Sequence, residues 1–276
     1  MRRRSALKNR RLLAGPYLVW SAGFILIPLA MTIFYGFTDK SGTFTLENIA
    51  SISSPENLKA LWLSVLLSFI STVLCLLLAY PLAMILSNMK VNQSSFIVLI
   101  FILPMWMNFL LRTLAWQTLL EKNGIINMGL KFLHLPALTI INTPYAIILG
   151  MVYNFLPFMV LPIYNVLIKI DGNVINAARD LGANGIQTFL KVILPLSVPG
   201  VISGITMVFV PALTTFVISD LLGGSKILLI GNVIEQEFKQ TSNWNAGSGL
   251  SLVLMVFIFI SMAVTTKYDK EGGSVF

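Results

Sequence analysis

The amino-acid sequence predicts an all-α membrane protein with six transmembrane helices. Of its 276 residues, 56% are hydrophobic and only 11% are charged, and the mean hydropathy is +0.84, so the chain is far more apolar than an ordinary soluble domain. In addition, six stretches are apolar and long enough to cross a bilayer, which takes about 20 residues of helix. Because backbone polar groups cannot stay unpaired in lipid, helices are the expected form of these stretches.

The expected spans form a single six-helix transmembrane domain, residues 14–266, between a basic N-terminus of residues 1–13 and a short tail of residues 267–276. The first span follows six basic residues, but no small-residue cleavage site in a polar stretch follows it. We therefore expect a retained membrane anchor rather than a signal peptide. The spans lie at about 14–37, 60–87, 95–120, 143–168, 196–219 and 249–266.

The distribution of basic residues predicts that both termini are cytoplasmic. With the N-terminus inside, twelve Lys and Arg residues fall in the inner regions and six in the outer loops, while Arg112 lies within a span. The net charge of +8 is therefore mainly a signal of topology, and we do not expect the basic N-terminus to bind nucleic acid. Seven of the eleven acidic residues lie in the outer loops, so the outer mouth is expected to be acidic.

A polar segment rich in small residues, residues 169–195, separates the fourth and fifth spans and is expected to face the cytoplasm. Its charged side chains predict that it lies outside lipid as two short helices hinged at Gly182. Glycine can adopt the left-handed conformation that ends the first helix, and Asn184 with Gln187 three residues later would cap the second. We interpret this segment as a docking surface.

The same segment resembles the cytoplasmic loop of ABC importer permeases, which sits in a cleft of the ATP-hydrolysing subunit. The family pattern is Glu-Ala-Ala, three residues, Gly, and then an apolar stretch that ends Leu-Pro-Leu-x-x-Pro-Gly. The resemblance implies that this loop, including Asp180, couples the chain to an ATPase. Asn176 stands where the family usually has Glu, which removes a carboxylate that would pair with a basic residue of the ATPase. The matching residues are Ala177, Ala178, Gly182, Ala183, Phe189, Pro195, Leu196, Pro199 and Gly200.

From the second span onward, the chain also resembles the B-type permease subunits of spermidine/putrescine importers. This resemblance implies a type I (MetI-like) permease of a bacterial cell membrane, which transports by alternating access. It also implies four kinds of partner: the membrane, a second C-type permease, two ABC ATPase subunits that bind ATP and Mg, and an extracytoplasmic binding protein that delivers a polyamine. The chain itself would be non-catalytic and would hold no cofactor. The resemblance rests on Leu156–Tyr164, Ala177–Ala183, Gln187–Phe189, Ser219–Gly224 and Leu229–Ile234.

Polar and aromatic side chains within the spans are candidates for lining the pathway, because such groups are costly in lipid. An extended multivalent cation is best held by carboxylates with aromatic faces between them. Arg112 fits such a path poorly, so we expect it to neutralise a carboxylate or to point away, and Asp220 either admits the cation or only ends a helix. The candidates are Trp106 and Arg112 on a third-span stripe with Asn108 and Trp116, Tyr153 and Asn154 in the fourth span beside Pro157 and Pro162, Thr214 in the fifth, and Asp220 at its far end.

The chain has too few suitable residues to support other functional classes. The single cysteine, Cys75, and the single histidine, His134, exclude a disulfide and most metal sites, and no Gly-x-x-x-x-Gly-Lys-[Ser/Thr] motif occurs. A secondary transporter would show inverted repeats or membrane-buried coupling carboxylates, and a membrane enzyme would need a catalytic cluster. Within the ABC class, another substrate, such as an anion or a different organic cation, is the alternative. The preferred polyamine would be selected by the binding protein, not by this chain.

Overall fold

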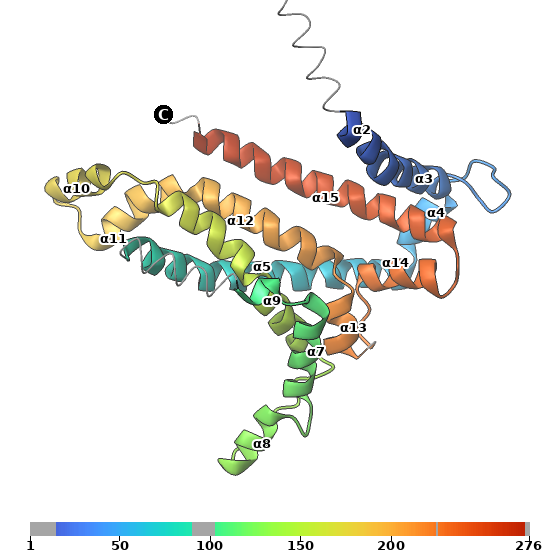
Figure 1. Cartoon of the computed structure of the whole chain (residues 1–276), viewed down its shortest axis with the longest axis horizontal. Coiled ribbons are helices and arrows are strands. Elements are labelled where there is room, and N and C mark those ends of the chain that lie inside the picture. Colours follow the sequence, from blue (N-terminus) through green and yellow to red (C-terminus); the bar gives the residue numbers. More distant parts are fainter. Residues whose placement is uncertain (1–14, 90–102, 225, 274–276) are drawn as a thin grey trace, which may run out of the picture. The chain divides into compact units, whose positions relative to one another are not determined.

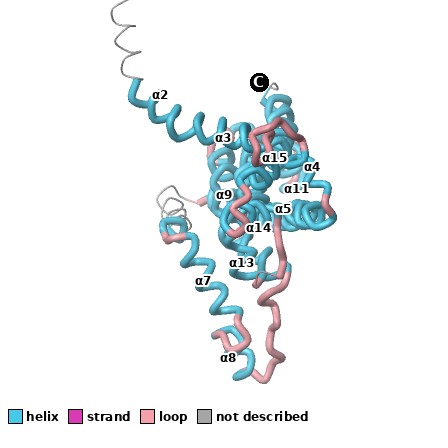
Figure 2. The backbone as a smooth tube through the Cα atoms, turned by 90° about the vertical axis from the view of Figure 1, so that its right-hand side faces the viewer, coloured by secondary structure: helices cyan, strands magenta, loops and turns pink. Residues whose placement is uncertain are grey.

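A computed structural model describes residues 15–89, 103–224 and 226–273, with side chains as far as residue 265. Over these ranges the regular elements are helices, with one isolated bridge between Thr38 and Phe44 (Figure 2). The expected N-terminus, residues 1–13, lies outside the described residues. The chain divides into two compact units, Met1–Asn57 with Ile234–Phe257, and Leu58–Val233 with Ile258–Phe276, and each is described by itself.

The first expected span is confirmed as one apolar helical stretch, Gly15–Gly36, in the first unit. It consists of α2 (Gly15–Ser21), a wider π-type turn (Ala22–Leu26) and α3 (Ile27–Gly36). Two short helical segments, α4 (Glu47–Ala50) and a 3₁₀ turn (Ser51–Ser53), follow the loop after α3.

Two asparagine amides satisfy the carbonyl groups at the C-terminal end of α3, which have no partner within the helix. The Asn48 side chain donates to the Thr38 carbonyl at 2.8 Å and to the Gly36 carbonyl at 3.4 Å. The Asn245 side chain donates to the Tyr35 carbonyl at 3.2 Å and also to that of Thr38 at 2.6 Å. These bonds tie the α3 end to the loop and to α15 (Trp244–Gly273) within the first unit.

In the second unit, α5 (Pro55–Asn88, which begins in the first unit) carries the second expected span and α9 (Pro144–Leu167) the fourth. Small side chains form a buried stripe along α5, and small residues let helices approach closely in a membrane. The Ser71 hydroxyl donates to the Met151 sulfur at 3.4 Å, which joins this stripe to α9. The stripe comprises Ser64, Ser68, Ser71, Thr72, Cys75, Ala79 and Ala83.

Close packing of α12 (Leu194–Thr214) on α9 depends on the two glycines expected to allow helix approach, Gly200 and Gly204. A Cβ at Gly200 would lie 2.9 Å from the Pro162 carbonyl oxygen, and one at Gly204 would lie 2.6 Å from the Met159 sulfur. The two backbones therefore touch where no side chain intervenes. Helix α9 continues through Pro157 and Pro162 without a break.

The third expected span, residues 95–120, is only partly described, because residues 95–102 lie outside the described ranges. Its described part is not one helix: a 3₁₀ turn (Leu103–Trp106) is followed by α7 (Phe109–Leu120). The Asn108 side chain accepts from the Leu110 N–H at 2.8 Å and so caps a new helix start. After α7, α8 (Ile125–Phe132) lies at its far end in both views (Figures 1 and 2).

The fifth and sixth spans are confirmed as long apolar helices, but their limits differ from those expected. The fifth runs over Gly185–Thr214 instead of 196–219, and the sixth lies in α15, which continues to Gly273 rather than ending at 266. Helical hydrogen bonding does not depend on apolar side chains, so a helix can extend beyond the apolar stretch that predicts it.

Candidate coupling loop and transport pathway

The segment between α9 and α12 begins with α10 (Gly172–Asp180), whose first turn is capped by Asp171. At its end Gly182 has φ of +84°, the left-handed conformation that the sequence predicted. The Gly182 N–H donates to the Arg179 carbonyl at 2.8 Å and the Ala183 N–H to the Ala178 carbonyl at 3.0 Å. This is a Schellman motif, and it closes α10 with its last carbonyls satisfied.

The predicted capping box is also present, at the start of α11 (Gly185–Thr188). The Asn184 side chain accepts from the Gln187 N–H at 2.8 Å, and the Gln187 side chain accepts from the Asn184 N–H at 3.0 Å. Both ends of the short connection between α10 and α11 are therefore fixed by hydrogen bonds.

The expectation of a separate second short helix is wrong, because α11 continues into the fifth span. A π-type turn, η4 (Phe189–Ile193), joins α11 to α12, and the Leu194 N–H bonds to the Phe189 carbonyl. Pro195, which follows, has no N–H to offer the preceding turn, and the wider turn accommodates it without ending the helix. The loop and α12 are therefore joined by one continuous helix, which contains a π-type turn.

Of the eight residues expected to couple the chain to the ATPase, five lie at the surface. Asn176, Ala177, Asp180, Gly182 and Pro195 are exposed, while Ala178, Ala183 and Phe189 are half-buried. Two apolar side chains that the motif does not include are also exposed, Leu181 at 90% and Ile186 at 71%. Exposed apolar side chains beside a rigid turn are typical of an interaction surface.

At the other end of α12 (Figure 1), Asp220 does not extend the fifth span, as the sequence suggested, but lies on a separate helix, α13 (Val217–Gly223). Helix α12 ends at Thr215, whose backbone is extended, and Gly231 of α14 (Ile230–Lys239) packs against the carbonyls there; a Cβ at this glycine would lie 2.7 Å from the Thr214 oxygen. As predicted, the chain turns after Asp220 at glycine: Gly224 ends α13 with φ of +62°.

The side chain of Asn232, 1% exposed, organises this end of the second unit. Its amide group donates to the Asp220 carboxylate at 2.7 Å and to the Phe216 carbonyl at 3.1 Å. Its oxygen accepts from the Ser219 hydroxyl at 2.5 Å and from the Leu229 N–H at 3.0 Å. All four hydrogen-bonding positions of the amide are used, which holds Asp220 in one orientation.

The expected third-span stripe is not a single helical face, because Trp106 lies in the 3₁₀ turn and Asn108 caps α7. Trp106 is 79% exposed. Trp116 meets Tyr153 of α9 edge to face, with ring centroids 5.1 Å apart, and Tyr153 keeps 38% of its surface exposed. Of the expected pathway residues, Trp116 and Tyr153 are therefore in contact, and this contact joins α7 to α9. The Thr214 hydroxyl instead bonds to the Val210 carbonyl of its own helix at 3.1 Å.

Arg112 and Asn154 are buried polar residues whose hydrogen-bonding capacity is not fully used in the described part of the chain. Arg112 is 7% exposed and its Nε has no acceptor; Asn154 is 1% exposed, donates to the Gly150 carbonyl at 2.9 Å, and its Oδ1 has no donor. No carboxylate lies within 4 Å of the Arg112 guanidinium among the described side chains, so the expected neutralising partner is not found there.

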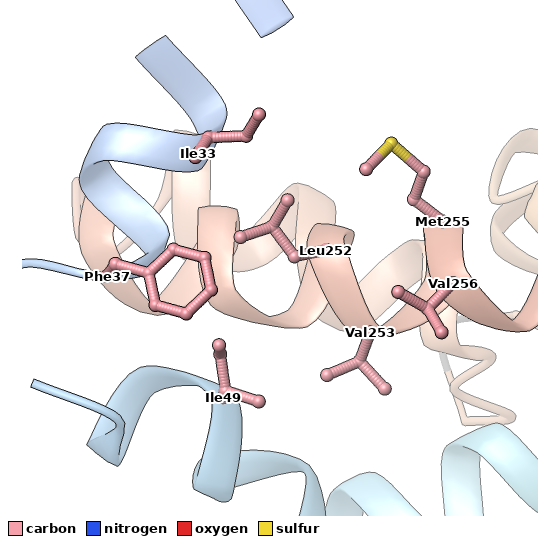
Figure 3. Close-up of a pocket in the computed structure, with 7 residues that line it drawn as sticks. All are labelled: Ile33, Phe37, Ile49, Leu252, Val253, Met255 and Val256. Carbon is pink, nitrogen blue, oxygen red and sulfur yellow. The ribbon is translucent and has the colours of Figure 1, made fainter. Parts of the chain in front are cut away.

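A pocket of about 450 Å³ lies in the first unit and contains none of the predicted site residues. Apolar side chains of α3, α4 and α15 line it, as Figure 3 shows. Such a lining contains no carboxylate that could hold a multivalent cation. No cluster of three or more His, Cys, Asp and Glu side chains suited to a metal ion occurs in the described residues. The lining residues are Ile33, Phe37, Ile49, Leu252, Val253, Met255 and Val256.

Sequence reasoning missed Asn232 and Tyr80. Asn232 belongs to the Leu229–Ile234 stretch that resembles the permease family, and a polar residue between apolar neighbours is its only signal. Tyr80 lies near the end of α5 among alanines, leucines and a proline, and nothing in its neighbourhood distinguishes it. Their partners are distant in the sequence, so only the packed structure identifies them.

Long apolar helices joined by a capped polar loop and by short helices define a multi-pass membrane transport protein. A family model described as "Binding-protein-dependent transport system inner membrane component" matches residues 49–270, and the chain belongs to this family. It is therefore a non-catalytic permease of a bacterial cell membrane.

Two curated relatives are similar over nearly the whole chain. The spermidine/putrescine transport system permease protein PotB of Haemophilus influenzae is 38% identical over 260 residues, which cover 91% of each chain. The PotB protein of Escherichia coli is 36% identical over 259 residues, covering 91% of this chain and 94% of the relative.

Solved structures support the fold. A chain of a bacterial ABC transporter that imports the acidic polysaccharide alginate superposes with a TM-score of 0.80 at 16% identity, over 98% of this chain and 99% of that one. A chain of the MetNI methionine ABC transporter, in an inward-facing conformation, gives a TM-score of 0.55 at 18% identity, over 78% and 95%. The type I ABC importer permease fold is thereby confirmed.

Proposed function

We propose that this chain is the permease subunit of an ATP-driven ABC importer and forms half of the pathway for polyamines such as spermidine and putrescine. The observation that carries the substrate class is the similarity to spermidine/putrescine permeases, 38% identical over 91% of the chain. The stretches that resemble these permeases include Ser219–Gly224 and Leu229–Ile234. They contain Asp220 and Asn232, whose side chains are hydrogen-bonded to each other.

The complete transporter contains a second, C-type permease, two ABC ATPase subunits that bind ATP and Mg, and an extracytoplasmic binding protein. The family description itself refers to a binding protein, and a solved structural neighbour is an alginate transporter in complex with its periplasmic protein. In this proposal both termini are cytoplasmic, residues 14–266 form one six-helix domain, and residues 267–276 form the cytoplasmic tail. The loop at about 169–195 docks on the ATPase.

The loop transmits ATP-driven movement through α12. Closure of the ATPase dimer moves α10 and α11, and the unbroken helix Gly185–Thr214 carries this movement toward α13. At that end Asp220 attracts the cation, while Tyr153 and Trp116 offer ring faces further along. Asn154, Thr214, Trp106 and Arg112 complete the proposed lining.

Uptake of labelled spermidine tests this function in cells that lack their own polyamine importer and express all four kinds of subunit. Asp220→Asn keeps the oxygen that accepts from Asn232 but removes the charge. We expect uptake to fall about tenfold, the size of losing one charge-assisted contact, with assembly and basal ATPase activity unchanged. Glu121→Gln, a neutralised exposed acid beyond α7, is the matched control.

The possible outcomes test the polyamine assignment and the role of Asp220 separately. Absence of spermidine and putrescine uptake by the unmodified, assembled complex would refute the polyamine assignment and favour another substrate. Normal uptake by the Asp220→Asn protein, or uptake lost only together with assembly, would assign Asp220 a structural role and leave the polyamine assignment in place.

A further inference from the structure

Tyr80 of α5 contacts the helix that leaves the coupling loop at two points. Its hydroxyl lies 2.7 Å from the Ser197 hydroxyl, and its ring meets that of Phe189 edge to face, with centroids 5.7 Å apart and an interplanar angle of 84°. Phe189 and Ser197 are eight residues apart, just over two helical turns. One side chain therefore spans this stretch of helix.

The direction of the hydrogen bond follows from the other bond that Ser197 makes. The Ser197 hydroxyl donates its single proton to the Leu194 carbonyl at 2.9 Å. A serine hydroxyl has one proton and two lone pairs, so toward Tyr80 it accepts, and the tyrosine donates. Ser197 is fully buried, so this bond is shielded from competing water.

The spanned stretch contains the least regular part of the helix. The π-type turn Phe189–Ile193 begins at the residue on which the Tyr80 ring packs and ends just before the Leu194–Ser197 turn. Such turns are wider than α-helical turns and are common where a helix bends in function. Without a brace, a push on α11 would bend the helix here instead of moving α12.

We propose that Tyr80 is a positioning residue that braces the π-type turn and so couples the loop to α12. This inference rests on the proposed function of the loop, and it assigns a role to a residue outside the family motif. Ala79 and Ala83, which precede and follow Tyr80 on α5, are fully buried. This part of α5 is therefore closely packed, which holds Tyr80 in position.

Single-group variants separate the brace from general packing. Tyr80→Phe removes the donor and keeps the ring, and Ser197→Ala removes the acceptor. Two matched controls delete hydroxyl groups elsewhere: Ser87→Ala on α5, whose hydroxyl bonds only within its own helix to Met84, and Tyr145→Phe, whose side chain is 74% exposed.

The complete transporter, reconstituted in lipid, gives two readouts. The first is the number of substrate molecules taken up per ATP hydrolysed, with assembly and basal ATPase activity as checks. The second is amide hydrogen exchange over residues 189–194, which requires no substrate. We expect each brace variant to lower the coupling ratio about fivefold, the size of one lost hydrogen bond, and to speed exchange in this segment. Because Ser197→Ala also removes the bond to the Leu194 carbonyl, the double variant should be no worse than Ser197→Ala alone.

The controls should leave both readouts unchanged. Wild-type coupling in Tyr80→Phe and Ser197→Ala would overturn the proposal, and so would faster exchange with normal coupling, which would make the contact purely structural. Additive losses in the double variant would show that the two hydroxyls act separately, which also contradicts a brace. If polyamines prove not to be the substrate, the exchange readout still tests the brace.

Discussion

Asn184 and Gln187 each accept, through the side chain, a hydrogen bond from the backbone N–H of the other, at 2.8 and 3.0 Å. Two residues earlier, Gly182 takes the left-handed conformation that closes α10. Together these features give the connection between α10 and α11 one defined path. A loop that transmits force needs such a path, because a flexible connection would absorb the movement.

Replacement of Gly182 tests this rigidity. At φ of +84° a side chain is strained, at a cost of about 1–2 kcal/mol and more for a β-branched residue, although no neighbour lies within 4 Å of the new Cβ. We expect Gly182→Val to lower transport and ATPase stimulation together while the protein still inserts in the membrane. Gly185→Ala, also without close neighbours but outside the left-handed region, should behave as wild type. Normal transport by a well-expressed Gly182→Val protein would contradict a role of the Gly182 turn in coupling the loop to the ATPase.

The orientation in the membrane is testable with single cysteines in a Cys75→Ala background. Leu181 and Phe132 are suitable positions, because their side chains are 90% and 84% exposed. We expect an impermeant thiol reagent to label Phe132→Cys from outside intact cells and Leu181→Cys only after lysis. The reverse pattern would place the loop outside and invert the topology.

The approach of α12 to α9 at Gly200 predicts a stability defect. A Cβ there would lie 2.9 Å from a backbone oxygen, that of Pro162, so Gly200→Ala must push the helices apart. Overpacking of this kind costs about 1–3 kcal/mol, and we expect a lower melting temperature for the purified protein. Gly129→Ala in α8, with nothing within 4 Å, serves as the control. Equal melting temperatures of the two variants would show that α12 and α9 do not pack this closely.

Asp39, in the loop after α3, predicts a local pH dependence. Hydrogen bonds from the Ser41 and Thr43 side chains, and from the Thr43 N–H, lower the pKa of its carboxyl from 3.8 to about 2. The loop is therefore stabilised fully above pH 3.8, and this contribution is lost as the pH falls through about 2.

Removal of the largest contribution checks this assignment. Ser41→Ala should raise the pKa of Asp39 toward 3.8, as followed by NMR titration of the labelled carboxyl. Ser54→Ala, whose hydroxyl lies in another turn and accepts from the Asn57 N–H, should leave it unchanged. An Asp39 that titrates at its ordinary value in the unmodified protein would show that these hydrogen bonds do not persist in solution.

The sequence by itself determined the class, the five long apolar helices found in the described residues, and the glycine turn and capping box of the coupling loop. Apolar length identifies a span without knowledge of its neighbours, because lipid demands internal backbone hydrogen bonding. The left-handed Gly182 and the Asn184 capping box were likewise predictable, since both depend on residues within five positions of each other.

Only the tertiary structure decided where the fifth span ends and which distant side chains meet. Gly231 packs against the carbonyls at the break after Thr214, and the orientation of Asp220 depends on Asn232, twelve residues away. The contact of Tyr80 with Ser197 joins residues 117 positions apart. Such pairs leave no periodic pattern in the sequence, because they are set by how helices pack and not by the preference of any local segment.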